Sequence, residues 1–217
     1  MSVTDRRAFI LANTRLQSPP HTPELSLHLA DEITPIWRLT EEALGEMGVP
    51  PPFWAFAWAG GQAVARYVLD HPEVVAGKRV LDFATGSGLV AIAAVKAGAA
   101  SALGCDIDDW CGTAVALNAA INEVEVAFTA ENLLLRPPPL VDVVLAGDIS
   151  YEKPMAKAAR DWLAAARGQG AMVLMGDPGR SYFERDGLTQ LASYQVATTR
   201  ELEDAEVKCT GVWRFTD

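Results

Sequence analysis

The feature that most constrains the fold is a short apolar strand that runs directly into a glycine-rich turn and then into an alanine-rich helix. The strand is predicted over Arg79–Phe83, and Asp82–Ala91 reads Asp-Phe-Ala-Thr-Gly-Ser-Gly-Leu-Val-Ala. Gly86 and Gly88 let the backbone come close to a ligand, and Ala91 keeps helix and strand tightly packed. This order predicts one unit of an open parallel sheet, which binds ligands beyond the carboxyl ends of its strands.

The alternation of strand and helix continues along the chain. We predict strands over Arg79–Phe83, Ala102–Ile107, Val124–Thr129, Val141–Ala146 and Ala171–Met175, and helices over 61–70, 88–97, Cys111–Asn122 and Pro154–Arg167. The alternating residues of Tyr194–Arg200 and Glu206–Phe215 predict a terminal hairpin, whose strands must be antiparallel. The chain is therefore predicted to have an α/β fold: a Rossmann-like, doubly wound seven-stranded sheet, mostly parallel, with an antiparallel C-terminal hairpin.

Residues 1–59 differ from the rest of the chain because they are rich in proline and lack the alternation of strand and helix. Prolines punctuate them and leave room for two helices, at Thr4–Thr14 and Ile36–Met47. Four large aromatic residues within Phe53–Trp58 are too dense for a surface loop unless they line something. We interpret residues 1–59 as a helical cap and aromatic linker that do not fold independently, and residues 60–217 as the cofactor-binding domain.

Two carboxylates indicate which cofactor the glycine-rich turn holds. The pattern Gly-x-Gly-x-x-Ala alone suits a dinucleotide enzyme about as well as other adenosine-binding proteins. Asp106 ends the next predicted strand, where a carboxylate can accept both hydroxyls of an adenosine ribose. Asp82 would repel a pyrophosphate but favours the ammonium and sulfonium of S-adenosylmethionine. With Thr85, Gly86 and Gly88 in the same loop, we predict an S-adenosylmethionine site.

Side chains after the later strands predict the rest of the site. Asn132 is placed to reach the adenine edge, although a role as a loop turn residue is an equally good interpretation. Asp148 and Tyr151 follow the fourth strand and are the predicted catalytic residues. A carboxylate there can accept hydrogen bonds from an attacking amine, and a ring can pack against the methylated nitrogen. Asp177 is interpreted as a turn residue, and Arg180 as a candidate substrate contact.

Composition restricts the partners. A net charge of −10 and a pI near 4.8 argue against a nucleic-acid partner and favour a basic one. No segment approaches the roughly 20 apolar residues that span a bilayer, so no membrane association is expected. The cysteines Cys105, Cys111 and Cys209 predict neither a disulfide framework nor a metal site. We therefore expect a metal-free protein of a reducing, cytoplasmic compartment.

Four segments carry a resemblance that covers nearly the whole chain: Pro51–Phe56 through Gly60–Gln62, Asp106–Asp108, Gly147–Tyr151 and Gly176–Arg180. In them the chain resembles the lysine methyltransferases, bacterial members included, that modify the beta subunit of electron transfer flavoprotein. The resemblance implies S-adenosylmethionine-dependent protein-lysine N-methylation, with that subunit as the protein substrate.

By the same resemblance, Trp58 would lie against the cofactor, Asp106 would hold its ribose with Ile107 beside it, and Asp148–Tyr151 would be the substrate-side motif. Ser150 stands where the family commonly has an aromatic residue, which leaves the choice of substrate open.

The predicted reaction is a direct in-line attack of a neutral lysine amine on the sulfonium methyl group. Three alternatives stay open at this point. The chain could methylate a small amine or another protein such as a ribosomal protein, it could be a nicotinamide-dependent reductase, or it could bind the cofactor without catalysis. The target lysine and the oligomeric state do not follow from the sequence.

Overall fold

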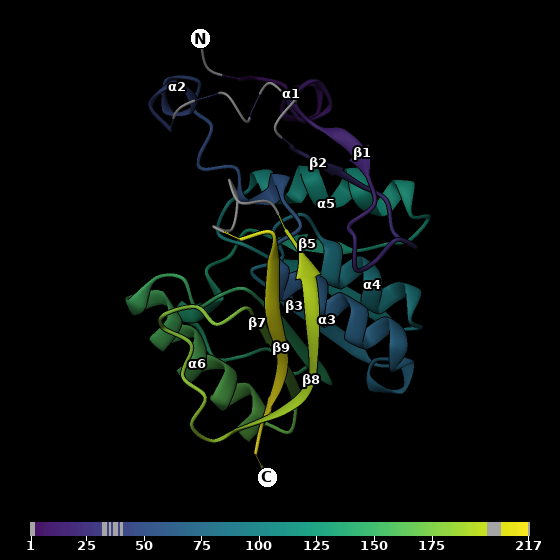
Figure 1. Ribbon diagram of the computed structural model, residues 1–217, viewed down its shortest axis with the longest axis vertical. Helices are drawn as coiled ribbons and strands as arrows, with labels where there is room; N and C mark the ends of the chain where they lie inside the picture. The colour runs from purple at the N-terminus through teal and green to yellow at the C-terminus, as the bar shows by residue number, and fades with distance from the viewer. Residues whose placement is uncertain are drawn as a thin grey trace.

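A seven-stranded sheet forms the centre of the computed structural model, in which residues 3–31, 34, 36, 39, 41–198 and 205–216 are described (Figure 1). The strand order is β5-β4-β3-β6-β7-β9-β8. The five strands from β5 to β7 are parallel, and β9 pairs antiparallel with both β7 and β8. The strands are β3 (Arg79–Phe83), β4 (Ser101–Cys105), β5 (Ala127–Thr129), β6 (Val143–Gly147), β7 (Met172–Asp177), β8 (Leu188–Ala197) and β9 (Val207–Phe215). This topology confirms the predicted fold class.

Helices cover both faces of the sheet. On one face lie α3 (Ala59–Asp70), α4 (Leu89–Lys96) and α5 (Trp110–Ile121), and on the other lies α6 (Lys153–Gly168) (Figure 1). Strand β6 shows why its sequence is apolar throughout: Val143 and Leu145 enter the core under α3 and α4, whereas Val144 and Ala146 enter the core under α6.

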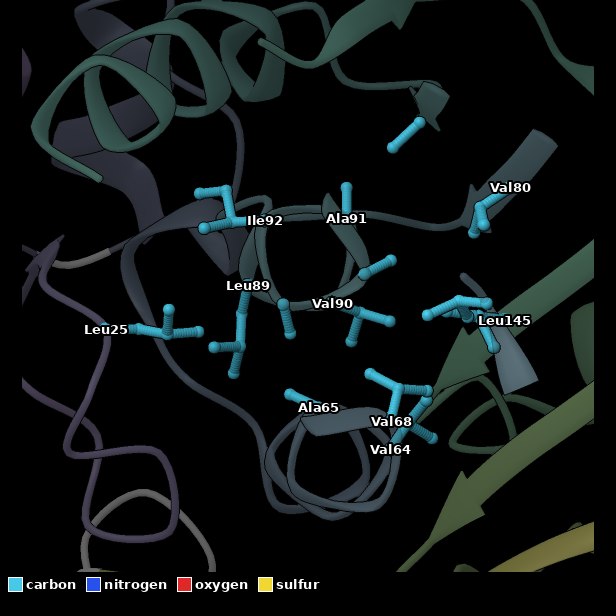
Figure 2. Close-up of a cluster of buried hydrophobic side chains, with 14 of the residues drawn as sticks. Leu25, Val64, Ala65, Val68, Val80, Leu89, Val90, Ala91, Ile92 and Leu145 are labelled. Carbon is cyan, nitrogen blue, oxygen red and sulfur yellow. The ribbon is translucent and has the colours of Figure 1, made fainter. Parts of the chain in front are cut away.

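Figure 2 shows the first of these cores, where side chains of α3 meet those of α4 beside the strand residues Val80 and Leu145. Val64, Val68 and Leu145 are all completely buried in it. Leu25, from the N-terminal segment, packs into the same core from outside the sheet (Figure 2).

The N-terminal segment lies against α5. It contains α1 (Arg6–Asn13), a hairpin of β1 (Arg15–Gln17) and β2 (Leu27–Leu29), and α2 (Glu41–Glu46). Two asparagines of α5 hold the hairpin: Asn118 Oδ1 accepts the N–H of His28 at 2.7 Å, and Asn122 Oδ1 accepts that of Ser26 at 3.1 Å. Two backbone N–H groups in or next to β2 therefore find their acceptors on α5.

Some predicted boundaries were wrong, and one pair of strands was missed. The missed pair is the β1–β2 hairpin. The helix predicted over Ile36–Met47 is observed only as Glu41–Glu46, and part of the remainder lies outside the described residues. Strand β5 is three residues long, half its predicted length. Strand β8 begins at Leu188, before the predicted start at Tyr194, while residues 199 and 200 of that prediction lie outside the described part. None of the described helices combines the length and hydropathy needed to cross a bilayer.

Candidate active site

A cavity of about 530 Å³ opens at the carboxyl ends of β3, β4 and β6, and we call it the strand-end cavity. This is the edge of a doubly wound sheet where ligands bind. Its volume is in the range of small-molecule sites. It is lined by Phe53, Trp58, Phe83, Ala84, Gly86, Cys105, Asp106, Ile107, Asp108, Cys111, Glu131, Asn132, Leu133, Leu134, Gly147, Asp148, Tyr151, Glu152, Pro154, Met155 and Arg180.

Seven of the ten predicted site residues line this cavity. They are Trp58, Gly86, Asp106, Ile107, Asn132, Asp148 and Tyr151, which come from five different connections between elements. The other three, Asp82, Thr85 and Gly88, do not line it. The structure therefore brings most of the predicted site together, while Asp82, Thr85 and Gly88 lie outside the cavity lining.

The glycine-rich loop leaves β3 through a tight left-handed path. Ala84, Gly86 and Gly88 all have positive φ values, of 57°, 52° and 83°. Gly88 also has no room for a side chain, because an added Cβ would lie 3.0 Å from Cγ2 of Val115. A positive φ at Ala84, which is not a glycine, is uncommon and typical of a functional loop.

Asp82 holds this loop together from the inside. Its side chain is completely buried, and its Oδ2 accepts the Thr85 hydroxyl at 2.6 Å and the Ala91 N–H at 3.0 Å. Burial raises the pKa of Asp82 to about 7. The charge of Asp82 thus meets groups of the loop itself, rather than the interior of the cavity.

Asp106 forms the junction between the loop and the cavity. Its two carboxylate oxygens accept the N–H groups of Gly86 and Asp108, each at 3.1 Å. Ile107 beside it is 75% exposed and lines the cavity. Asn132 also lines the cavity and caps a short 3-10 helix, Leu133–Leu135, by accepting the Leu134 N–H at 3.1 Å. Both interpretations of Asn132, turn residue and cavity residue, are compatible with this position.

An aromatic rim borders the cavity. Phe53 lies between Trp58 and Tyr151, with ring centroids 5.9 and 5.8 Å away. The indole N–H of Trp58 donates to the Phe53 carbonyl at 3.0 Å, which fixes the ring. Partial burial, and secondarily the charge of Asp106, raise the pKa of the Tyr151 hydroxyl, which keeps it neutral. Of the four aromatic residues in Phe53–Trp58, Phe53 and Trp58 therefore line the cavity, whereas Trp54 is buried in a hydrophobic core against which Phe56 packs.

Asp148 lines the strand-end cavity and is buried. It has a positive φ of 60°, and its Oδ2 accepts the Gly60 N–H at 3.0 Å. Its Oδ1 accepts from Nε of Arg180 at 2.5 Å, in an ion pair whose side chains are 4% and 21% exposed. This pair was not predicted, because the two residues are 32 positions apart in the sequence.

Asp177 shapes the turn that presents Arg180. Its Oδ1 accepts the N–H groups of Gly179 at 2.7 Å and Arg180 at 2.8 Å, as predicted for a turn residue. Burial raises the pKa of Asp177 to about 6. Arg180 lines the cavity, but its guanidinium is engaged with Asp148.

Glycines allow the backbone at the start of α3 to pack directly against the ends of β6 and β7. An added Cβ at Gly60 would lie 2.4 Å from the Gly176 carbonyl oxygen and 2.5 Å from the Asp148 nitrogen. One at Gly147 would lie 2.6 Å from Cα of Gly61. These glycines were missed as site residues, although their presence at strand ends and at a helix start was the available signal.

The cavity is acidic. Five carboxylates line it, against the single guanidinium of Arg180; they are Asp106, Asp108, Glu131, Asp148 and Glu152. Such a site favours cationic ligands. Within the described part of the chain, no group of three or more His, Cys, Asp or Glu side chains could hold a metal ion.

Comparisons with known proteins agree with this geometry. Residues 66–176 match the family model described as Ribosomal protein L11 methyltransferase (PrmA). The electron transfer flavoprotein beta subunit lysine methyltransferase of Xenopus laevis is 39% identical over 220 residues, covering 99% of this chain and 88% of that protein. Its counterpart in Danio rerio is 36% identical over 221 residues, covering 99% and 84%. Among solved structures, ribosomal protein L11 methylase from Lactobacillus delbrueckii subsp. bulgaricus aligns with a TM-score of 0.51 at 22% identity, covering 73% of this chain and 79% of that one.

The fold, the acidic cavity at the strand ends and the full-length similarity lead to one assignment. This chain belongs to the family of electron transfer flavoprotein beta subunit lysine methyltransferases and is an S-adenosylmethionine-dependent methyltransferase.

Proposed function

We propose that this methyltransferase modifies lysine side chains of the beta subunit of electron transfer flavoprotein. The observation that carries the proposal is the 39% identity, over 99% of the chain, to the Xenopus laevis protein named for that activity. The acidic cavity supports it, because both a lysine and S-adenosylmethionine are cationic. The low pI of the chain argues against a nucleic-acid substrate, and its three free cysteines support a reducing compartment, which we propose is the cytoplasm.

The residues at the ends of β3 and β4 fit S-adenosylmethionine. A carboxylate offers about four acceptor positions. Asp106 uses one on each oxygen for a backbone N–H, which leaves each oxygen able to accept a ribose hydroxyl. Ile107 and Asn132 flank the position proposed for the adenine, and Trp58 would cover the cofactor from the rim.

Asp82, Thr85 and Gly88 would serve the cofactor through the shape of the loop. The hydrogen bonds of Asp82 to Thr85 and Ala91 fix the path that presents Gly86 at the cavity. We therefore assign these residues to building the site, and Gly86 to the close approach of backbone and cofactor.

When bound, S-adenosylmethionine supplies a methyl group already activated on a sulfonium centre. The chain must admit a lysine amine that arrives protonated, since an exposed lysine has a pKa of about 10.4. The rings of Tyr151 and Trp58 offer faces to the ammonium, in contacts worth about 0.5–2 kcal/mol. Tyr151 is 49% exposed, so the amine can lose its proton to water at the open mouth.

Asp148 would align the amine. Its carboxylate is held by the Gly60 N–H and by Arg180, and therefore keeps its orientation as the substrate approaches. Each oxygen retains an acceptor position for the amine. The chain thus contributes alignment and a fixed negative charge beside the nitrogen that becomes cationic.

A direct assay tests the proposal. The enzyme is incubated with labelled S-adenosylmethionine and the beta subunit from the same source, and the modified residue is located by tandem mass spectrometry. We expect label on a lysine of the subunit, and its loss when that lysine is replaced by arginine. An unlabelled subunit under conditions in which the enzyme binds S-adenosylmethionine would refute the proposal.

A second candidate substrate is ribosomal protein L11, because the family model that matches residues 66–176 carries that name. The two proteins are assayed side by side at equal concentration. If L11 alone is labelled, then L11 and not the flavoprotein subunit is the substrate.

A further inference from the structure

A second cavity of about 580 Å³ lies next to the strand-end cavity, and we call it the α6 cavity. It is bounded by the first half of α6 and by residues 181–184, which follow β7. Pro154 lines both cavities, and Ile149 and Ser150 line this one from between Asp148 and Tyr151. The two cavities therefore share a wall at the substrate-side motif.

Apolar side chains form much of the α6 cavity. Leu163, Met175 and Ile149 are buried there, and Phe183 packs in the same core. Tyr182 also lines the cavity and is 43% exposed. A cavity of this volume accommodates a large apolar side chain with room for its flanking backbone.

The cations on the wall of the α6 cavity differ in whether they form an ion pair. Lys157 pairs with Asp161 at 2.7 Å, and Arg160 pairs with Glu184 at 3.6 Å. Lys153, the first residue of α6, makes no ion pair within the part of the chain that the structure describes. Lys153 is exposed, so its ammonium can pair with a carboxylate of a bound partner.

We propose that the α6 cavity docks the protein substrate: it binds a large apolar side chain a few residues from the target lysine, and Lys153 pairs with a carboxylate next to it. The inference rests on the proposed protein-lysine activity. Pro154, which lines both cavities, marks the path of the bound segment between them. An extended segment advances about 3.3 Å per residue, so the apolar side chain and the lysine are expected a few residues apart. The apolar pocket and the cation then select the segment, while the acidic cavity receives the lysine.

Cross-linking tests the position of the substrate. A photo-reactive phenylalanine analogue replaces Tyr182 in the full chain, and the same analogue at Leu16, exposed on β1, is the control. We expect a cross-link from position 182 to a substrate peptide within about four residues of the methylated lysine, and no such product from position 16. Cross-links from position 182 only to distant substrate regions, or only to a second copy of the enzyme, would overturn the inference.

Charge reversal tests Lys153. Lys153→Glu should fold normally, because an acidic residue is favoured in the first turn of a helix. The matched control is Lys96→Glu at the exposed end of α4, which changes the net charge equally. We expect KM for the protein substrate to rise about fivefold or more in Lys153→Glu and to change little in Lys96→Glu. The affinity for S-adenosylmethionine should be unchanged in both. Equal KM values for the two variants would overturn the role of Lys153.

Failure of this inference is distinguishable from failure of the proposed function. If the wild-type enzyme methylates the flavoprotein beta subunit but position 182 does not cross-link near the lysine, the docking site is wrong and the function stands. If the subunit is not methylated, the function is wrong. The cross-link is then measured on the protein that the enzyme labels in a lysate of its own source. A cross-link near the methylated lysine of that protein supports the α6 cavity as the docking site, and its absence overturns it.

Discussion

Replacement of Asp148 by asparagine separates alignment of the substrate from binding of the cofactor. Asp148→Asn keeps the size of the side chain and an oxygen that can accept the Gly60 N–H, but it removes the charge that pairs with Arg180. It also removes the negative charge proposed to face the developing cation on the amine. Two effects are therefore expected, one on stability and one on turnover.

The stability effect follows from the ion pair. Breaking a fully buried pair costs about 3–5 kcal/mol. Arg180 is 21% exposed, so that water screens part of its uncompensated charge, and about 2–3 kcal/mol is expected here. For a chain of this size, that loss corresponds to a fall in Tm of about 4–12 °C. Asp142→Asn is the matched control, because it weakens an exposed pair with Arg79 at 3.0 Å and should lower Tm less than Asp148→Asn does.

The catalytic effect is measured below the new Tm. We expect turnover at saturating S-adenosylmethionine to fall tenfold or more, which corresponds to about 1.4 kcal/mol or more in the barrier. The dissociation constant of the cofactor, from calorimetric titration, should change little. Tyr151→Phe should lower turnover less, since the ring face remains. Unchanged turnover together with lost cofactor affinity would refute the reasoning and assign Asp148 to the cofactor.

Four further predictions concern the cofactor, the partner, titration and packing. Asp106→Ala should weaken S-adenosylmethionine binding by about 1.5–3 kcal/mol in calorimetric titration, the range for hydrogen bonds to a charged group, and an unchanged affinity would remove the ribose assignment. The methylation rate at low protein substrate should fall as salt rises from about 0.05 to 0.3 M, since screening weakens steering by the acidic chain, and a flat profile would exclude steering. Asp82 has a folded-state pKa raised to about 7, so its contribution to stability is present below about pH 4 and is lost as pH rises to about 7. Denaturant unfolding at several pH values should show this slope in the wild type and a smaller one in Asp82→Asn; equal slopes would contradict it. Gly60→Ala should destabilise the fold by about 1–3 kcal/mol because its Cβ meets the Gly176 carbonyl, whereas Gly168→Ala, with open space around it, should be neutral or stabilising in the same thermal assay.

The sheet was predictable because its signals are local. Strands buried on both faces are continuous apolar runs, as in Val143–Gly147, and glycine-rich turns mark their ends. The β1–β2 hairpin has no such signal. Its strands are three residues long, and its backbone is held by Asn118 and Asn122, about 90 residues later in the chain.

The sequence predicted several of the residues that line the candidate site, but it did not predict their hydrogen-bond and ion-pair partners. Strand ends predicted that Asp106, Asp148 and Tyr151 would meet at one cavity, and they do. The hydrogen bonds that Asp82 accepts from Thr85 and Ala91 depend on the path of the loop that follows β3, which spacing does not reveal. The pairing of Asp148 with Arg180 joins two loops that only the finished sheet brings together.

We propose that this enzyme methylates lysine on the beta subunit of electron transfer flavoprotein in its own cells. The most direct measurement is tandem mass spectrometry of that subunit, purified from source cells that have or lack this gene. We predict methyllysine in the first sample and its absence in the second, with recovery when the wild-type gene is returned and no recovery with Asp106→Ala. Methyllysine that persists at the same residues without the gene would contradict the claim.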